Sequence, residues 1–281
     1  MSVLAALPLP WPFDTESTQL ALAAGVVVAA CAPLIGVFIV QRRQSLMGDG
    51  VGHVAFAGVA AGFLIDVWPV WTALGFAVVA ALVIELLRSR GRATGDLALA
   101  FVFYSGLAAA AVMIGKSDVS HERVENYLFG SILDLGTDDL LTIIGLGVAI
   151  LVVLGLIGRA LVAISVDEEA ARVTGLPVDA CNAALSVLTA VTIVAAMRVL
   201  GILLVAAMMV LPVASSRLVA RSFRGTVVLA VGVSVVSAIG GLAAARAWDL
   251  EPGGAIVLCA ALLFVSVAVA SLGQQTARTE G

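Results

Sequence analysis

Long hydrophobic stretches recur along the chain, and short polar segments separate them. Two of the stretches, 140–158 and 226–245, contain no charged residue. A run of about 20 apolar residues is long enough to cross a bilayer as an α-helix. Hydropathy predicts nine such segments, at 19–40, 48–65, 69–87, 95–114, 140–164, 181–197, 200–216, 226–246 and 254–272.

The sixth and seventh segments are short and touch at Met197–Gly201. They form either two full spans or one re-entrant pair, which would reduce the count to eight. Composition agrees with a membrane protein, because 62% of the 281 residues are hydrophobic and 12% are charged, against about 25% charged in soluble domains. We therefore expect an all-α, polytopic membrane helix bundle of eight or nine transmembrane helices.

The positive charges indicate which end of the bundle faces the cytoplasm. With the N-terminus outside and the C-terminus inside, eleven arginines fall on inner segments: Arg42, Arg43, Arg88, Arg90, Arg92, Arg159, Arg172, Arg217, Arg221, Arg224 and Arg278. The outer side keeps four cations: Lys116, Arg123, Arg198 and Arg246. This distribution follows the positive-inside rule, and all four tryptophans (Trp11, Trp68, Trp71, Trp248) fall at the outer boundary, as expected for interfacial aromatic residues.

The stretch MGDGVGHVAFAG at 47–58 places two polar residues in an apolar segment. Asp49 and His53 stand four residues apart, so they share one helix face. A carboxylate oxygen and an imidazole nitrogen suit a divalent ion such as Zn²⁺ or Mn²⁺. The alternatives are that Asp49 caps the helix and that His53 bonds a carbonyl. The surrounding glycines allow close helix packing, or a local break in the helix.

Four sequence blocks, in order, resemble signatures of the permease subunits of bacterial zinc and manganese ABC importers. They are RRQSLMGDGVGHVAFAGVAAG at 42–62, ENYLFGSILDLGTDDL at 125–140, MRVLGILLVAAMMVLPVASSRLVA at 197–220 and PGGAIVLCAALLF at 252–264. The resemblance extends from about residue 20 to 272. It implies that Asp49 and His53 form a metal-binding gate in the translocation path.

The resemblance also implies partners and a location. Such a permease works in the bacterial plasma membrane as a dimer, with cytoplasmic ABC ATPase subunits and an extracytoplasmic metal-binding protein. ATP hydrolysis then belongs to the separate ATPase subunit, and the chain itself is not an enzyme. No cofactor is bound permanently; the ion is cargo, Zn²⁺ first and Mn²⁺ second. The chain would form one permease domain, 1–281, with an external tail (1–18), an outer loop (117–139), an inner loop (165–178) and a cytoplasmic tail (273–281).

The inner loop SVDEEAARVTGLP predicts a short helix of its own. Ser165 and Glu168 have the spacing of a capping box, and Gly175 suits a left-handed helix end before Pro177. This segment resembles the coupling helix by which such permeases contact their ATPase; the plainer alternative is a surface helix between spans. The coupling residues would be Asp167, Glu168, Glu169, Ala170, Ala171, Arg172, Val173, Thr174 and Gly175.

The segment 117–140 is too polar to cross the membrane and too long for a simple turn. It holds His121 beside Glu122. These two residues either receive an ion from the extracytoplasmic metal-binding protein or serve as ordinary loop polarity.

Other function classes find less support in the sequence. The GKS at 115–117 lacks the first glycine of a phosphate-binding loop and lies at an outer helix end. A gradient-coupled secondary metal transporter would need no ATPase, but no convincing inverted repeat is visible. An intramembrane enzyme is disfavoured by the presence of only two histidines. Cys31, Cys181 and Cys259 lie singly in three apolar segments, which fits small buried side chains.

Overall fold

The computed structural model describes residues 10–89, 95–117, 119–132 and 135–279, and this part of the chain is helical throughout its length apart from turns. Within these described residues, nine helices are long and apolar enough to cross a membrane. Their bounds are α1 Glu16–Gln41, α2 Met47–Leu64, α3 Pro69–Ser89, α4 Gly95–Ile114, α6 Thr137–Val166, α8 Val178–Leu200, α9 Ile202–Val219, α10 Phe223–Trp248 and α11 Pro252–Thr279. Two short helices, α5 His121–Phe129 and α7 Glu168–Val173, lie in the connections.

The prediction of nine spans is confirmed in preference to eight. Helices α8 and α9 have 23 and 18 residues, and each is long enough to cross the hydrocarbon core. They meet at Gly201, whose φ of 77° is a left-handed conformation that favours glycine. The chain therefore reverses direction at one residue, which explains why hydropathy alone did not separate the two segments clearly.

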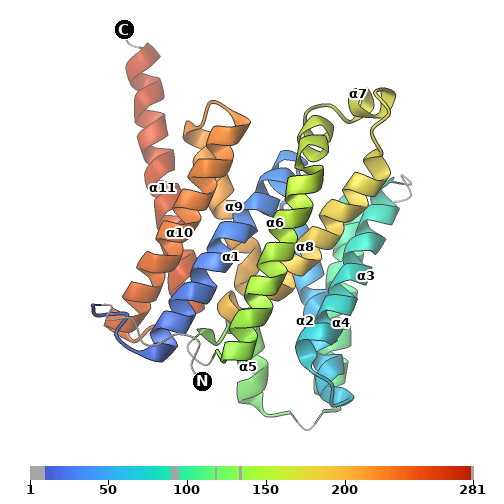
Figure 1. The fold of residues 1–281 in the computed structure, drawn as a ribbon, viewed down its shortest axis with the longest axis vertical. Helices are drawn as coiled ribbons and strands as arrows, with labels where there is room; N and C mark the ends of the chain where they lie inside the picture. Colours follow the sequence, from blue (N-terminus) through green and yellow to red (C-terminus); the bar gives the residue numbers. More distant parts are fainter. Residues whose placement is uncertain (1–9, 90–94, 118, 133–134, 280–281) are drawn as a thin grey trace.

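Helix α1 begins at one end of the bundle, and α11 ends at the other (Figure 1). The end that carries α7 also carries Arg42, Arg88 and Arg217 at the ends of α1, α3 and α9. We call it the inner end, following the positive-inside prediction, and the end with α5 the outer end. Arg90, Arg92, Asp118, Asp134, residues 1–9 and residues 280–281 lie outside the described residues.

The four tryptophans belong to the outer end. Trp68 and Trp71 flank the connection from α2 to α3, Trp248 ends α10, and Trp11 precedes α1. Between 50% and 71% of the surface of each is exposed, as expected for rings that lie at the headgroup level.

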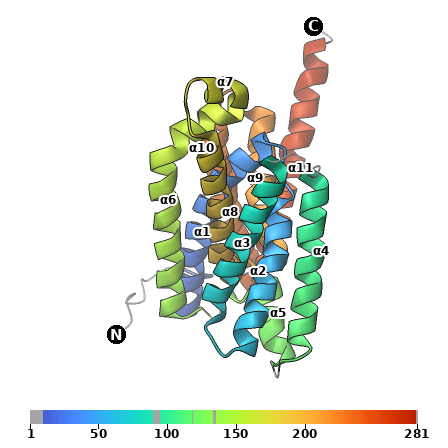
Figure 2. The ribbon, with the colours of Figure 1, turned by 90° about the vertical axis from the view of Figure 1, so that its right-hand side faces the viewer.

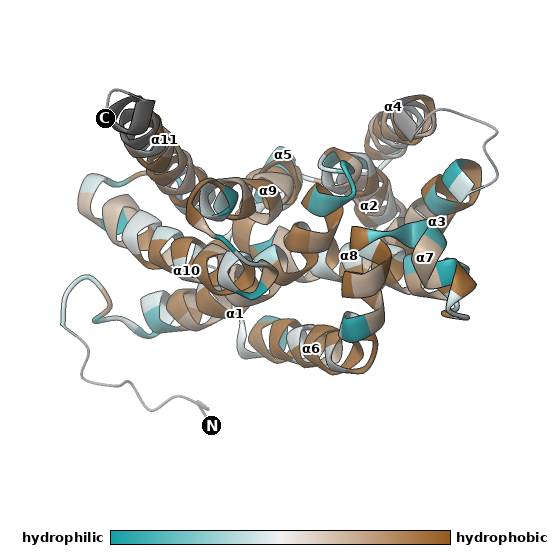
Figure 3. Cartoon of the chain, turned by 90° about the horizontal axis from the view of Figure 1, so that it is seen from above, coloured by the Kyte–Doolittle hydropathy of each residue, from teal (hydrophilic) through white to brown (hydrophobic). Residues whose placement is uncertain are grey.

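Helix α8 runs through the centre of the bundle, and 72% of its most apolar window is buried, against 17% for α11 at the periphery (Figures 1 and 2). Viewed along the helices, hydrophobic residues cover outward-facing as well as inward-facing surfaces (Figure 3). A helix that is hydrophobic on all sides and still exposed fits a lipid environment. Helix α11 continues to Thr279, so the segment expected as a cytoplasmic tail largely prolongs this helix.

Candidate metal site

Helix α2 begins directly after a compact turn at the inner end of α1. Arg43 adopts a left-handed conformation with a φ of 57°. The backbone N–H of Gln44 donates to the carbonyl of Ile39, and that of Met47 donates to the carbonyl of Gln44, each over 2.9 Å. These bonds fix the direction in which α2 leaves α1.

Asp49 lies in the first turn of α2, near the inner end rather than the centre of the bundle. Leu46 occupies the N-cap position, and no side chain caps the helix, so Asp49 is not the capping residue. Within the described part of the chain, no hydrogen bond or ion pair satisfies its carboxylate. A negative charge at this position is favoured by the helix dipole, but its oxygens remain available to a ligand.

His53 follows one turn later on the same face of α2. Its ring lies 4.3 Å from that of Phe103 on α4, at an interplanar angle of 66°. Its Nδ1 atom is buried and has no hydrogen-bond partner, which does not support the alternative that this nitrogen bonds a carbonyl. The side chains of Asp49 and His53 also interact electrostatically.

A cavity of about 240 Å³ lies between α2 and α4. Among the residues whose side chains are described, Asp49 is the only charged one in the lining, and the others are Leu46, Leu99, Ala100, Phe103 and Tyr104. Phe103 thus forms part of the wall and also contacts His53. Asp49 therefore borders a space large enough for an ion with bound water, and His53 contacts one wall of that space through Phe103.

The described residues contain no group of three or more histidine, cysteine, aspartate or glutamate side chains that could hold a metal. If Asp49 and His53 both bound an ion, one chain would supply two ligands, which is too few for a closed structural zinc site of four ligands. Two ligands fit an open site from which an ion can leave.

Glycines on α2 bring neighbouring helices close but do not break the helix. A side chain at Gly58 would meet the Cα atom of Ala73 on α3 at 2.7 Å, and one at Gly106 on α4 would meet the backbone of Val54. Helix α2 runs without interruption from Met47 to Leu64. Of the two roles expected for the glycines, close packing is the one that the structure displays.

His121 and Glu122 are both exposed in the first turn of α5. This helix lies at the outer end, whereas Asp49 lies near the inner end (Figures 1 and 2). The structure therefore does not bring the two pairs together.

The predicted helix of the inner loop is present as α7, with six residues or nearly two turns. Gly175 ends it with a φ of 84°, as expected. The predicted capping box is wrong, because α6 continues through Ser165 and the hydroxyl of that residue donates to the carbonyl of Leu161. Asp167 caps α7 instead, and its Oδ1 accepts from the backbone N–H of Ala170 over 2.9 Å.

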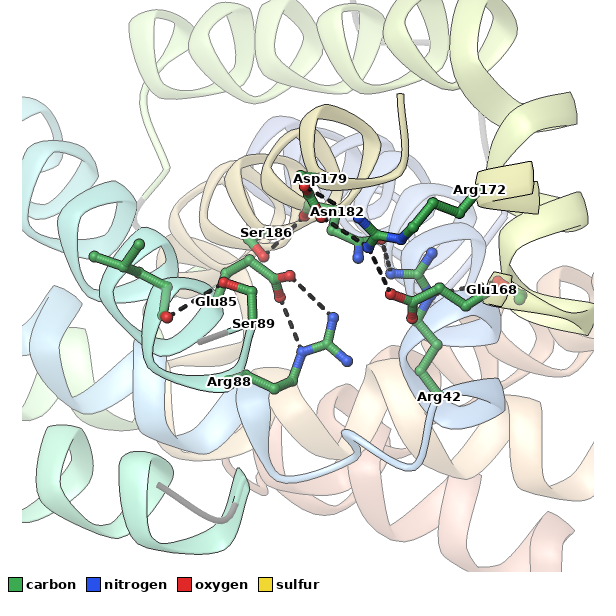
Figure 4. A network of polar contacts seen from close by, with 11 residues as sticks. Arg42, Glu85, Arg88, Ser89, Glu168, Arg172, Asp179, Asn182 and Ser186 are labelled. Carbon is green, nitrogen blue, oxygen red and sulfur yellow. Dashed lines mark hydrogen bonds and ion pairs between the residues drawn. The ribbon is translucent and has the colours of Figure 1, made fainter. Parts of the chain in front are cut away.

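Two polar contacts that join distant segments were not foreseen from the sequence. At the inner end, Nη1 of Arg42 donates to Oδ1 of Asn182 over 2.6 Å (Figure 4). At the outer end, Nη2 of Arg198 donates to Oδ2 of Asp139 over 2.9 Å, and the guanidinium lies 5.3 Å from the centre of the Tyr127 ring. A polar Asn182 within an apolar segment was the available signal for the first contact.

Comparison with known proteins places this arrangement in a family. Residues 14–271 match the model described as the ABC 3 transport family. The chain is 32% identical over 248 residues to the high-affinity zinc uptake system membrane protein ZnuB of Haemophilus influenzae, covering 87% of this chain and 94% of that protein. It is 29% identical over 252 residues to the manganese import system permease protein ScaB of Streptococcus gordonii, covering 90% of each.

A solved structure agrees with the sequence relatives. PsaBC from Streptococcus pneumoniae, in complex with Fab, superposes with a TM-score of 0.82 and 30% identity, over 90% of this chain and 91% of that chain. The family match covers most of the chain and the same bundle recurs, so the predicted resemblance is confirmed, as is the expectation that ATP is hydrolysed by a separate subunit. The chain belongs to the ABC 3 transport family, and it is a multi-pass permease of the plasma membrane.

Proposed function

We propose that this chain is the permease subunit of an ATP-driven importer for a divalent transition metal, and that Asp49 and His53 hold the ion during its passage. The observation that carries the proposal is the buried, unpartnered Nδ1 of His53, one helical turn from the Asp49 carboxylate beside a cavity. A buried polar atom without a partner is costly. A passing dication would satisfy both side chains.

Zn²⁺ is the first expected cargo and Mn²⁺ the second. Mixed nitrogen and oxygen ligands bind Zn²⁺ more tightly than Mn²⁺. Relatives with similar identity are named for zinc and for manganese, so sequence identity does not select one of the two ions. Direct uptake measurements with each metal would decide between them.

A second copy of the permease would complete the transport path. Two copies that face each other would supply four ligands, which is the number preferred by Zn²⁺. The cytoplasmic ABC ATPase would contact α7, which lies at the inner end with Val173 88% exposed. An extracytoplasmic metal-binding protein would deliver the ion at the outer end, where His121 and Glu122 are exposed.

The roles of the residues follow from their chemistry. The Asp49 carboxylate attracts and coordinates the cation, and the neutral His53 imidazole donates a lone pair, so the bound ion competes with a proton at this nitrogen. Phe103 and Leu99 restrict water around the ion. Because the site has few ligands in each chain, a rearrangement of the helices would be sufficient to release the ion.

The proposal is tested by ATP-dependent uptake of ⁶⁵Zn²⁺ and ⁵⁴Mn²⁺ in proteoliposomes that contain the assembled complex. Asp49→Asn and His53→Ala should each lower uptake by at least about tenfold, since each removes one of very few ligands. Asp66→Asn is the matched control, because Asp66 lies just beyond the outer end of α2. Uptake that is unchanged in both variants, or that needs no ATP, would overturn the proposal.

A further inference from the structure

A chain of polar contacts at the inner end links α7, through α8, to Arg42 at the end of α1 (Figure 4). Its first contact joins α7 to α8: Nη2 of Arg172 donates to Oδ1 of Asp179 over 3.0 Å. Arg172 also approaches Glu168 on its own helix at 3.4 Å. Because these side chains are exposed, this first contact is weak by itself.

The second contact lies one turn further along α8 and is better shielded from water. Asn182 is 2% exposed, and its Oδ1 accepts from Nη1 of Arg42 over 2.6 Å. The Nε of Arg42 makes a longer contact of 3.4 Å with the hydroxyl oxygen of Ser165, near the end of α6. The guanidinium of Arg42 thereby bridges α6 and α8, the two helices that α7 connects.

Arg42 is partly buried, although burial of a charged guanidinium is unfavourable. Burial lowers the pKa of Arg42, Arg88 lowers it further, and the carboxylates of Glu168 and Glu85 oppose both effects. Its Nη2 is buried without a hydrogen-bond partner. A cation that is retained with one unsatisfied N–H is expensive for stability alone, which favours a role in function.

The third step is covalent and short. Arg42 directly follows α1, and only four residues separate it from Met47 at the start of α2. The backbone hydrogen bonds of Gln44 and Met47 make this turn compact. Displacement of Arg42 is therefore passed to the first turn of α2, where Asp49 lies.

We propose that the contact between Arg42 and Asn182 is the tie through which movement of α7 repositions Asp49. Arg42 is in this sense a positioning residue and not a metal ligand. The inference rests on the proposed function, in which α7 contacts the ATPase and Asp49 holds the ion. It predicts that, without the contact between Arg42 and Asn182, the complex still hydrolyses ATP but transports less metal for each ATP.

The test measures metal transported per ATP hydrolysed, using the assembled complex in proteoliposomes. Asn182→Ala removes the acceptor, and Arg42→Lys keeps the positive charge but loses the planar guanidinium that spans Asn182 and Ser165. We expect both variants to assemble with the ATPase and to hydrolyse ATP, while the ratio falls about twofold to tenfold. Combining them should lower the ratio little further, because both remove the same contact.

Two further variants supply the controls. Asn182→Asp retains an acceptor for the guanidinium and should keep the ratio near that of the wild type. Arg43→Gln alters the neighbouring arginine of the same turn, which is exposed, and should leave the ratio unchanged. An equal fall in Arg43→Gln would assign the effect to the turn as a whole and overturn the proposal.

Other outcomes are equally decisive. An unchanged ratio of metal transported to ATP hydrolysed in Asn182→Ala and Arg42→Lys would overturn the proposal. Failure of these variants to assemble with the ATPase would also overturn it, because both residues would then have only a folding role. If the wild-type complex shows no ATP-dependent metal uptake, the proposed function fails instead. Wild-type uptake with an unaltered ratio in the variants would refute only the inference about Arg42.

Discussion

The guanidinium of Arg198 donates from Nη2 to the carboxylate of Asp139 over 2.9 Å, and this contact joins the outer ends of α8 and α6. Both side chains are largely buried, with 23% and 15% of their surface exposed. The backbone carbonyl of Arg198 also accepts from the N–H of Ser131, in the segment after α5. One residue thus connects three segments of the outer end.

Asp139→Asn should destabilise the protein, because it leaves the buried Arg198 cation without its charged partner. We expect the free energy of unfolding to fall by about 1–3 kcal/mol, measured by thermal or denaturant unfolding of the detergent-solubilised protein. Asp14→Asn is the control, since Asp14 and Arg246 are 3.8 Å apart and more exposed. A larger loss in the control than in Asp139→Asn would contradict this assignment.

Gly201→Ala should be more damaging than Gly175→Ala. Both glycines have positive φ values, 77° and 84°. A side chain at Gly201 would collide with the backbone of Phe129 and Gly130, whereas nothing lies within 4 Å at Gly175. We expect a cost of about 1 kcal/mol at Gly175 from the backbone conformation alone, and a clearly larger fall in unfolding temperature at Gly201. Equal falls in unfolding temperature for the two variants would show that the backbone around Gly201 moves easily to accept a side chain.

Asp167→Ala should loosen α7 by removing its N-cap. Loss of such a cap costs about 0.5–2 kcal/mol, and a helix of six residues has few other hydrogen bonds to compensate. Hydrogen exchange at the amides of 170–175 should accelerate, and recovery of the ATPase subunit with the permease should decrease. Asp167→Asn keeps a capping oxygen and should resemble the wild type; unaltered exchange in Asp167→Ala would rule out this role of the cap.

The orientation of the bundle is testable by cysteine labelling in a variant that lacks Cys31, Cys181 and Cys259. Ser120→Cys, at the start of α5, should react with an impermeant maleimide in intact cells. Thr174→Cys, at the end of α7, should react only after permeabilisation. Both positions are exposed, so access from the two sides of the membrane is the variable compared. The reverse pattern would invert the assignment of the inner and outer ends.

Hydropathy predicted the membrane helices well because the signal is contained within each segment. All nine predicted segments correspond to helices, and Asp49 and His53 share a helix face as their spacing indicated. The error at Ser165 has a local cause. The apolar run of α6 extends to Val166, and Asp167 then provides a capping oxygen at the residue where the chain becomes extended.

The remaining contacts depend on residues that are far apart in sequence. Arg42 and Asn182 are separated by 140 positions, and Arg198 and Asp139 by 59. No periodicity links such residues, since their proximity is set by how the helices pack. The cavity beside Asp49 likewise requires α4 to lie against α2, which the hydrophobic pattern of either helix does not specify.

The close packing of α2 at Gly58 against α3, and of Gly106 against α2, has a consequence for gating. Helices in backbone contact slide or bend separately only with difficulty, so α2, α3 and α4 are expected to travel as one block. Under the proposed function, access to the ion would then alternate through displacement of this block as a whole, while the spacing of Asp49 and His53 within it stays constant. Attempts to alter metal preference should accordingly target the side chains around Asp49 and His53, and attempts to alter transport speed should target the seams of the block.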